Sequence, residues 1–180
     1  MEKRIFIPLL FGCLLTAVIS PVAADQRPSG VMGFQWGESV EAANRRAIEM
    51  GLTLLDESLS QSAENSSGLR TSSYIGVLSG APGLLELKFH EGELYLLSIG
   101  YGELMYKVIY TILLHQLNEE YGTADNESMR MLDIPDANAW FAERMDIVLS
   151  MHHDSKTTLL SYADRVRLTK ALADYRLDWR

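Results

Sequence analysis

Cysteine is almost absent from this chain of 180 residues. The single cysteine, Cys13, lies in an apolar N-terminal stretch that has the pattern of a signal peptide. A mature chain without cysteine has no disulfide and no thiol nucleophile. Small secreted animal domains usually carry disulfides, so this absence favours export into a bacterial periplasm.

Basic residues are in the minority, with 16 Lys and Arg against 24 Asp and Glu and a net charge of −8. The sequence shows no basic patch. We therefore expect neither nucleic acid nor an anionic membrane surface as a partner, because both are recognised through clustered positive charge.

Local catalytic and metal-binding motifs are missing as well. The sequence contains no Gly-x-Ser-x-Gly elbow, no glycine-rich phosphate loop and no His-Glu-x-x-His helix. His152 and His153 are neighbours at a predicted turn, where adjacent strand side chains point to opposite faces, and His90 lies at another turn. We interpret all three as exposed turn histidines. We cannot assemble four ligands for a structural metal site from these positions. We expect no enzyme, no metal site and no cofactor. A hydrolase assembled from distant residues and a small-ligand carrier stay open as alternatives.

The N-terminus does contain a secretory signal pattern. Lys3 and Arg4 precede the apolar run Ile5–Ile19, and small residues end the segment at Ala24. This run is shorter than the roughly 20 apolar residues of a spanning helix. We expect cleavage of residues 1–24.

The remaining residues, 25–180, are expected to form one periplasmic domain without a membrane span. An uncleaved anchor and lipidation of Cys13 are the alternatives to cleavage at Ala24, the second because Leu10-Phe-Gly-Cys13 is faintly similar to a lipoprotein signal. Oligomeric state is not indicated by the sequence.

Hydrophobic periodicity predicts an α+β fold in the mature chain. It consists of tandem units, each a helix plus a three-stranded antiparallel meander, with the helices on one face of the sheet. The two pseudo-repeats cover about 33–102 and 103–163, and a C-terminal helix follows at about 165–176. Leu168 and Leu172 are expected to pack against the rest of the chain from this last helix. The predicted elements are helices at 40–50 and 104–121, strands at 73–79, 84–89, 93–101, 139–143, 145–152 and 157–162, and a short additional strand at 52–55. The buried face of the first helix is expected to consist of Val40, Ala43, Ala47 and Met50, and a turn is expected at Gly80–Gly83.

The helix at 104–121 carries apolar residues at helical spacing. They are Met105, Val108, Ile109, Ile112, Leu113, Leu117 and Tyr121. This pattern predicts that Ile109 and Ile112 are almost fully buried and that the helix is central to stability.

Three short motifs mark element ends: Phe34-Gln-Trp-Gly-Glu-Ser39 before the first helix, Phe89-His-Glu-Gly-Glu-Leu94 at a hairpin, and Tyr121-Gly122 at a helix end. With the element order, they make the chain similar to the small periplasmic α+β architecture of the outer-membrane assembly lipoprotein BamE and of the secreted β-lactamase inhibitor protein. The resemblance implies a non-catalytic protein that binds other proteins, such as an envelope assembly factor, an inhibitor or an immunity protein.

The strand at 93–101 is apolar on both faces, unlike a half-exposed strand. Tyr95, Leu97, Ile99 and Tyr101 alternate on the expected core face. Leu94 and Leu96 then face outward and are the candidate binding residues, unless another part of the chain covers them.

Export gives the first testable prediction. Because the cleavage signal ends at Ala24, N-terminal sequencing of the protein from its native cell should start at Asp25 or within a residue or two. Recovery of intact Met1, or of a lipid on Cys13, would contradict the prediction.

Overall fold

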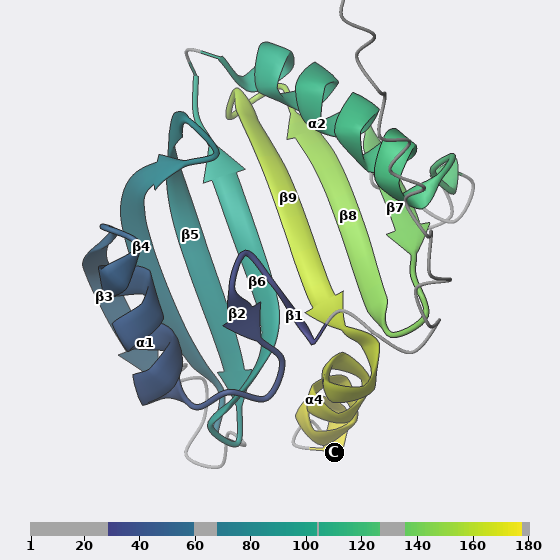
Figure 1. Cartoon of the computed structure of the whole chain (residues 1–180). Helices are drawn as coiled ribbons and strands as arrows, with labels where there is room; N and C mark the ends of the chain where they lie inside the picture. Colours follow the sequence, from purple (N-terminus) through teal and green to yellow (C-terminus); the bar gives the residue numbers. More distant parts are fainter. Residues whose placement is uncertain (1–28, 60–67, 104, 127–135, 178–180) are drawn as a thin grey trace, which may run out of the picture.

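The computed structural model describes residues 29–59, 68–103, 105–126 and 136–177. These residues form a mixed α+β fold (Figure 1). The expected signal peptide at 1–24 and most of the polar segment Ser58–Arg70 lie outside the described residues. In chain order the elements are β1 (Gly30–Val31), β2 (Phe34–Gln35), α1 (Val40–Glu49), β3 (Thr53–Leu59), β4 (Arg70–Leu78), β5 (Ala81–His90), β6 (Glu93–Tyr101), α2 (Tyr106–Tyr121), β7 (Ala137–Phe141), β8 (Met145–His152), β9 (Thr157–Asp164) and α4 (Arg165–Leu177).

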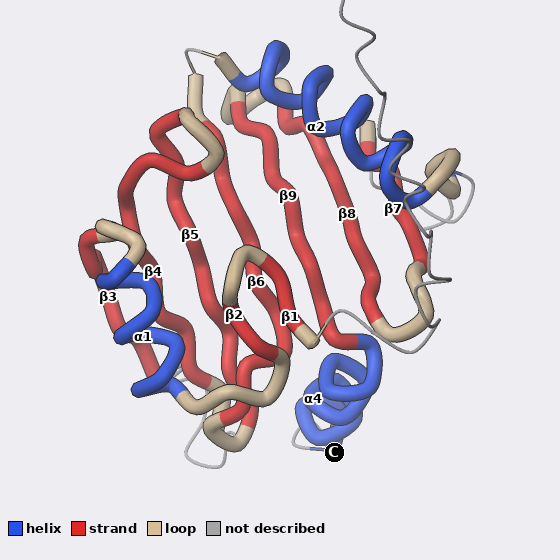
Figure 2. Tube along the Cα trace, viewed as in Figure 1, coloured by secondary structure: helices blue, strands red, loops and turns tan. Residues whose placement is uncertain are grey.

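One antiparallel sheet of seven strands unites the two predicted meanders. Its order is β3-β4-β5-β6-β9-β8-β7, so the last strand in sequence pairs with β6 at the centre. Helices α1 and α2 and the β1–β2 hairpin lie on the same face of this sheet, as Figure 2 shows. That arrangement leaves the opposite face of the central strands without either of these helices.

The first meander has four strands instead of the predicted three. The short strand expected at 52–55 extends to Leu59 as β3 and forms the sheet edge. The turn expected at Gly80–Gly83 is also shorter, because Leu78 already pairs with Ala81. Ser79 and Gly80 both have positive φ, and a two-residue turn of that kind matches the twist of the strands that it joins.

Helix α1 begins as its capping sequence predicts. The Ser39 hydroxyl accepts a hydrogen bond from the Ala42 backbone N–H at 3.3 Å. Val40, Ala43 and Ala47 are buried as expected, whereas Met50, predicted to share their face, is exposed. Met50 lies just after the helix, where the chain leaves the helical path.

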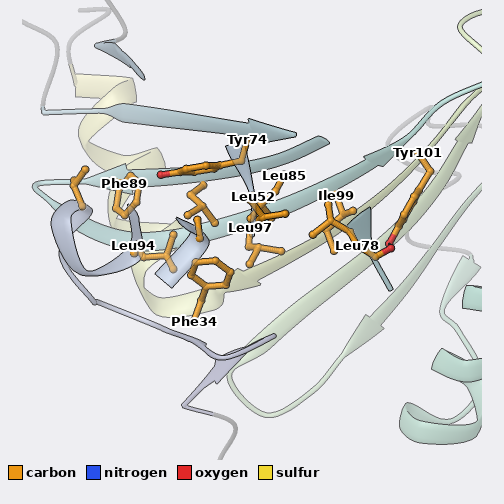
Figure 3. Close-up of a cluster of buried hydrophobic side chains, with 14 residues drawn as sticks. Phe34, Leu52, Tyr74, Leu78, Leu85, Phe89, Leu94, Leu97, Ile99 and Tyr101 are labelled. Atoms are coloured by element: carbon orange, nitrogen blue, oxygen red, sulfur yellow. The ribbon is translucent and has the colours of Figure 1, made fainter. Parts of the chain in front are cut away.

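The core under α1 is built from the inward side chains of the sheet (Figure 3). Leu85, Leu97 and Ile99 form its floor, and Phe34 from β2 packs against them. The Tyr74 hydroxyl, which would be an unpaired polar group in this core, donates a hydrogen bond to Asn44 Oδ1 on α1. Leu97, Ile99 and Tyr101 are buried in this core, as predicted, whereas Tyr95, which was expected on the same face, is only partly buried and is not among the buried residues of this core.

Helix α2 uses a different face from the one predicted. Ile112 is 50% exposed and Ile109 is only half-buried, so the prediction of near-complete burial is wrong. Leu117 is the buried residue instead, in the cluster with Ile147 and Leu160 from β8 and β9. Apolar residues occur on more than one side of α2, and the position of β8 and β9 under its C-terminal half decides which side is covered.

Helix α4 is held at the end of β6 and β9 largely by charge. The buried Asp164 carboxylate accepts from the Arg167 backbone N–H at 2.9 Å, and Arg167 Nε also donates to Glu93 at 2.9 Å. Of the leucines expected to pack here, Leu168 is half-buried but Leu172 is exposed, and the small Ala171 makes the close contact. Ion pairs thus replace the predicted apolar face.

Alanine substitutions in α2 test this helix assignment. Leu117→Ala should lower the free energy of unfolding by about 2–5 kcal/mol, because it leaves a cavity in the core. Ile112→Ala, on the exposed side, should cost less than about 1 kcal/mol. Urea unfolding of the two variants measures both values, and an equal loss would show that the buried face is misassigned.

Candidate functional site

The face of the seven-stranded sheet opposite α1 and α2, called the open face below, carries an apolar row. The strand register aligns one residue from each of β4, β5, β6 and β9 in this row: Ile75, Leu84, Gly100 and Leu159. Ile75 is 48% exposed and Leu84 is 36% exposed, whereas the next residue, Leu85, is fully buried on the other face. A one-sided antiparallel sheet would place polar side chains in such a row.

Gly100 interrupts the row and creates a hollow, called the notch below. It has a volume of about 350 Å³ and is lined by Leu84, Glu86, Ser98, Gly100, His152, Ser155, Thr157, Thr158 and Leu159. The nearest atom to a Cβ placed on Gly100 would be Leu84 Cβ at 3.9 Å, which is ordinary van der Waals contact. A side chain is therefore sterically possible at this position, and glycine leaves the space between two leucines vacant.

The apolar surface continues from the notch toward the end of the β4–β5 hairpin. Val77 pairs with Pro82 in the neighbouring row, and Val77 is 68% exposed. Together with Ile75 and Leu84 these residues form a strip across two strands. Contiguous exposed apolar surface of this kind is typical of contact sites for other molecules.

Hydroxyl groups line the other side of the notch and are already paired. Ser98 Oγ lies 2.9 Å from Ser161 Oγ across the β6–β9 pairing, and Ser155 Oγ lies 2.7 Å from Thr157 Oγ1. Because these hydroxyls are already hydrogen-bonded to each other, they do not require a ligand to satisfy them. The notch is thus suited to an apolar group, with polar contacts available at its rim.

Leu94 and Leu96, the two binding candidates from the sequence, do not share a face. A β-bulge places Phe89 opposite Leu94 and Lys88 opposite Leu96, so that Tyr95 is the extra residue. Leu94 is 0% exposed in the core under α1, so its predicted outward position is wrong. Leu96 is partly exposed on the open face, beside Lys88 and Ala163.

The residues that define the notch lie elsewhere on the same strand pair. Sequence reasoning missed Leu84 because it alternates as an ordinary strand residue, and missed Gly100 because it came near the end of a strand. The one available signal was a glycine in a strand interior, which often marks a close approach to another group.

The closest approach to a catalytic pair is also at this hollow. Ser150 Oγ lies 3.1 Å from His152 Nε2. Ser150 is nearly fully buried, and no carboxylate among the described residues is paired with His152. These groups lack the acid that would orient the imidazole of a serine hydrolase.

The histidines divide into exposed and buried sites. His152 and His153 are exposed, in agreement with their interpretation as turn residues, but His90 is only 5% exposed. His90 is covered because α4 packs against its hairpin: His90 Nε2 lies 3.2 Å from Asp174 Oδ2 on that helix. The interpretation of His90 as an exposed turn histidine is therefore wrong.

A second apolar hollow lies between the start of β5 and the N-terminus of α2. It has a volume of about 400 Å³ and is lined by Ala81, Pro82, Gly102, Glu103, Met105 and Ile109. Met105, Val108 and Ile112 continue this apolar surface along the outer side of α2. Glu103 is a charged residue in this lining, and its Oε1 lies 3.7 Å from Lys156 Nζ.

Comparison with models of known protein families finds no match for this chain, and comparisons with curated proteins and with solved structures find none either. Among the helices of the described residues, none has the length and apolar character needed to cross a membrane.

Aspartate substitutions at Leu94 and Leu96 should differ in their effect on stability, because Leu94 is buried and Leu96 is partly exposed. Leu94→Asp buries a charge in a closed core and should abolish folding or lower the melting temperature by more than about 10 °C. Leu96→Asp, on the open face, should leave most of the stability intact. Circular dichroism during thermal unfolding measures both, and similar melting would show that Leu94 and Leu96 share one environment.

Proposed function

We propose that this protein binds another protein through the open face of its sheet. The observation that carries the proposal is the notch at Gly100, set in a row of exposed apolar side chains. Such a row keeps apolar surface in contact with water, at a cost of about 25 cal/mol for each Å² that stays exposed, and Ile75 and Leu84 are 48% and 36% exposed. A partner chain that covers the strip from Val77 to Leu159 would remove part of this apolar surface from water.

The form of the notch favours an extended segment of a partner chain. Small-molecule sites are typically hollows of about 300–1,000 Å³ that enclose most of the ligand. The notch, at about 350 Å³, is at the lower end of this range, and because it lies open on a sheet surface it would enclose an apolar side chain better than a whole cofactor. Leu84 and Leu159 would flank that side chain, and residues beside it could contact the hydroxyl-lined rim.

The cellular setting is part of the same proposal. The N-terminal signal pattern and the acidic composition support a soluble periplasmic protein, and the similarity to BamE and to the β-lactamase inhibitor protein supports a binding role without catalysis. An envelope assembly factor, an inhibitor and an immunity protein are the classes that fit. The interpretation of the sheet as two tandem helix-plus-meander units belongs to this proposal as well.

A hydrolase is the second candidate, because Ser150 and His152 are within hydrogen-bonding distance beside the notch. The Ser150→Ala variant distinguishes the hydrolase hypothesis from the binding hypothesis. Loss of ester hydrolysis together with retained partner binding would favour the hydrolase. No comparable observation favours a small-ligand carrier.

Filling the notch tests the binding function directly. Gly100→Val should place methyl groups between Leu84 and Leu159 and lower partner capture from envelope extract at least tenfold. Stability should hold or rise by about 0.5–1 kcal/mol, since glycine weakens a strand interior. Quantitative affinity capture and thermal unfolding of the same preparation give the two values.

Gly102→Val is the matched control. A Cβ placed on Gly102 would have no atom within 4 Å, and this residue lines the other hollow, so the variant should capture the partner as the parent does. Undiminished capture by a folded Gly100→Val variant would refute the role of the notch.

A further inference from the structure

Three side chains with metal-ligating atoms meet where the β5–β6 hairpin contacts α4. They are His90 at the end of β5, Glu91 in the turn, and Asp174 on α4. One ligating atom from each lies within 4.8 Å of the other two. The contact of α4 with the hairpin, and not proximity in sequence, assembles this set.

The imidazole of His90 is the buried member of the set. Its side chain is 4% exposed, and Nε2 lies 3.2 Å from Asp174 Oδ2. The geometry is nevertheless not that of a hydrogen bond, and Nε2 has no hydrogen-bond partner among the described residues. A buried polar atom left in this state costs about 1–3 kcal/mol, so a group that takes its lone pair would stabilise the site.

We propose that His90, Glu91 and Asp174 bind a divalent metal ion of the zinc class. Zn²⁺ binds imidazole nitrogen and carboxylate oxygen at about 2.0–2.2 Å, which places neighbouring tetrahedral ligands roughly 3.3–3.6 Å apart. The 3.2 Å between His90 Nε2 and Asp174 Oδ2 is close to that separation. An imidazole ligand favours Zn²⁺ over Ca²⁺ and Mg²⁺, which prefer oxygen.

We assign the fourth position of the ion to a water molecule in a small cavity that adjoins two of the three ligands. A cavity of about 20 Å³ adjoins His90 and Glu91 and is also lined by Glu93, Tyr95, Arg167 and Lys170. A space of this size holds one water molecule. Three protein ligands and one water complete a tetrahedron, and the two carboxylates balance the charge of the ion.

Lys170 is the competitor for this site. Its Nζ donates a hydrogen bond to Glu91 Oε2 and forms an ion pair with this carboxylate. The Lys170 side chain is more than half exposed, so it can swing away when an ion takes its place. Zinc and Lys170 therefore bind Glu91 in alternation.

Two other histidine–carboxylate pairs provide matched controls. His115 Nε2 lies 3.4 Å from Glu119 Oε1, and His153 Nε2 lies 3.1 Å from Asp136 Oδ2. Both pairs are exposed, and neither belongs to a three-ligand cluster among the described residues. They share the imidazole–carboxylate chemistry of the proposed site but lack its burial and its third ligand.

Zinc titration of the purified, metal-free protein against a chromophoric chelator tests the site. One Zn²⁺ should bind per chain and raise the melting temperature. Glu91→Gln and Asp174→Asn should each weaken binding at least tenfold, whereas His115→Gln and His153→Gln should leave it unchanged. Lys170→Gln should tighten binding at least threefold, because it removes the competing cation.

The variants chosen keep the result interpretable. Glu91 is exposed and Asp174→Asn is isosteric, so both should fold, and thermal unfolding without metal verifies this. Absence of a zinc-dependent shift in the parent, unchanged binding in either ligand variant, or binding by Lys170→Gln no tighter than the parent would overturn the proposal. Absorption of bound Co²⁺ in the visible range distinguishes tetrahedral coordination from loose surface binding.

Discussion

The pairing of β6 with β9 is the interaction on which the rest of this fold depends. It joins the β3–β6 meander to the β7–β9 meander, and its partners are far apart in sequence: Ser98 and Ser161, 63 residues apart, share a hydrogen bond across it. On the core face the same pairing aligns Leu97 with Tyr162 and Ile99 with Leu160. Without it, each meander would have an exposed central edge and only part of a core. Tyr162 on β9 packs against both the core under α1 and the core under α2, so this one ladder brings the two cores side by side.

The same ladder also creates the open face. Side chains alternate across a strand, so every residue that β6 and β9 send to the core has a neighbour that points away from it. At Ser98 and Ser161 these outward neighbours are small and polar, but at Gly100 the row is a glycine between two leucines. An apolar row with a gap at its centre has no role in the core. We regard the gap as the feature that separates a binding surface from a merely hydrophobic one.

Much of the fold could be predicted from the sequence, because local signals set it. The ends of β6, the turn at Glu91–Gly92 and the Ser39 cap of α1 all follow from alternation, positive-φ residues and capping chemistry. The bulge at Tyr95 could not be predicted, since it depends on how β5 and β6 align, and it moves Leu94 into the core. The prediction of the buried face of α2 was wrong for a related reason. Both sides of this helix are apolar, and the position of the strands beneath it determines which side is buried. The sequence indicates an exposed histidine at position 90, because α4, the helix that covers His90, is far away in sequence. The candidate sites thus depend on contacts between residues far apart in sequence, which hydrophobic periodicity does not predict.

The two proposed sites lie at opposite ends of one hairpin, and this decides how they interact. From Leu84 in the notch to His90 at the metal ligands, β5 rises about 3.3 Å per residue, or roughly 20 Å in all. At that distance, and with no lining residue in common, the two sites should contribute independently to stability and binding. A metal ion between the turn and α4 would fix one end of the β5–β6 hairpin, while the notch end would stay accessible. Loss of zinc binding would therefore leave the binding face intact, and filling of the notch would leave the metal site intact, so that each hypothesis can fail without the other.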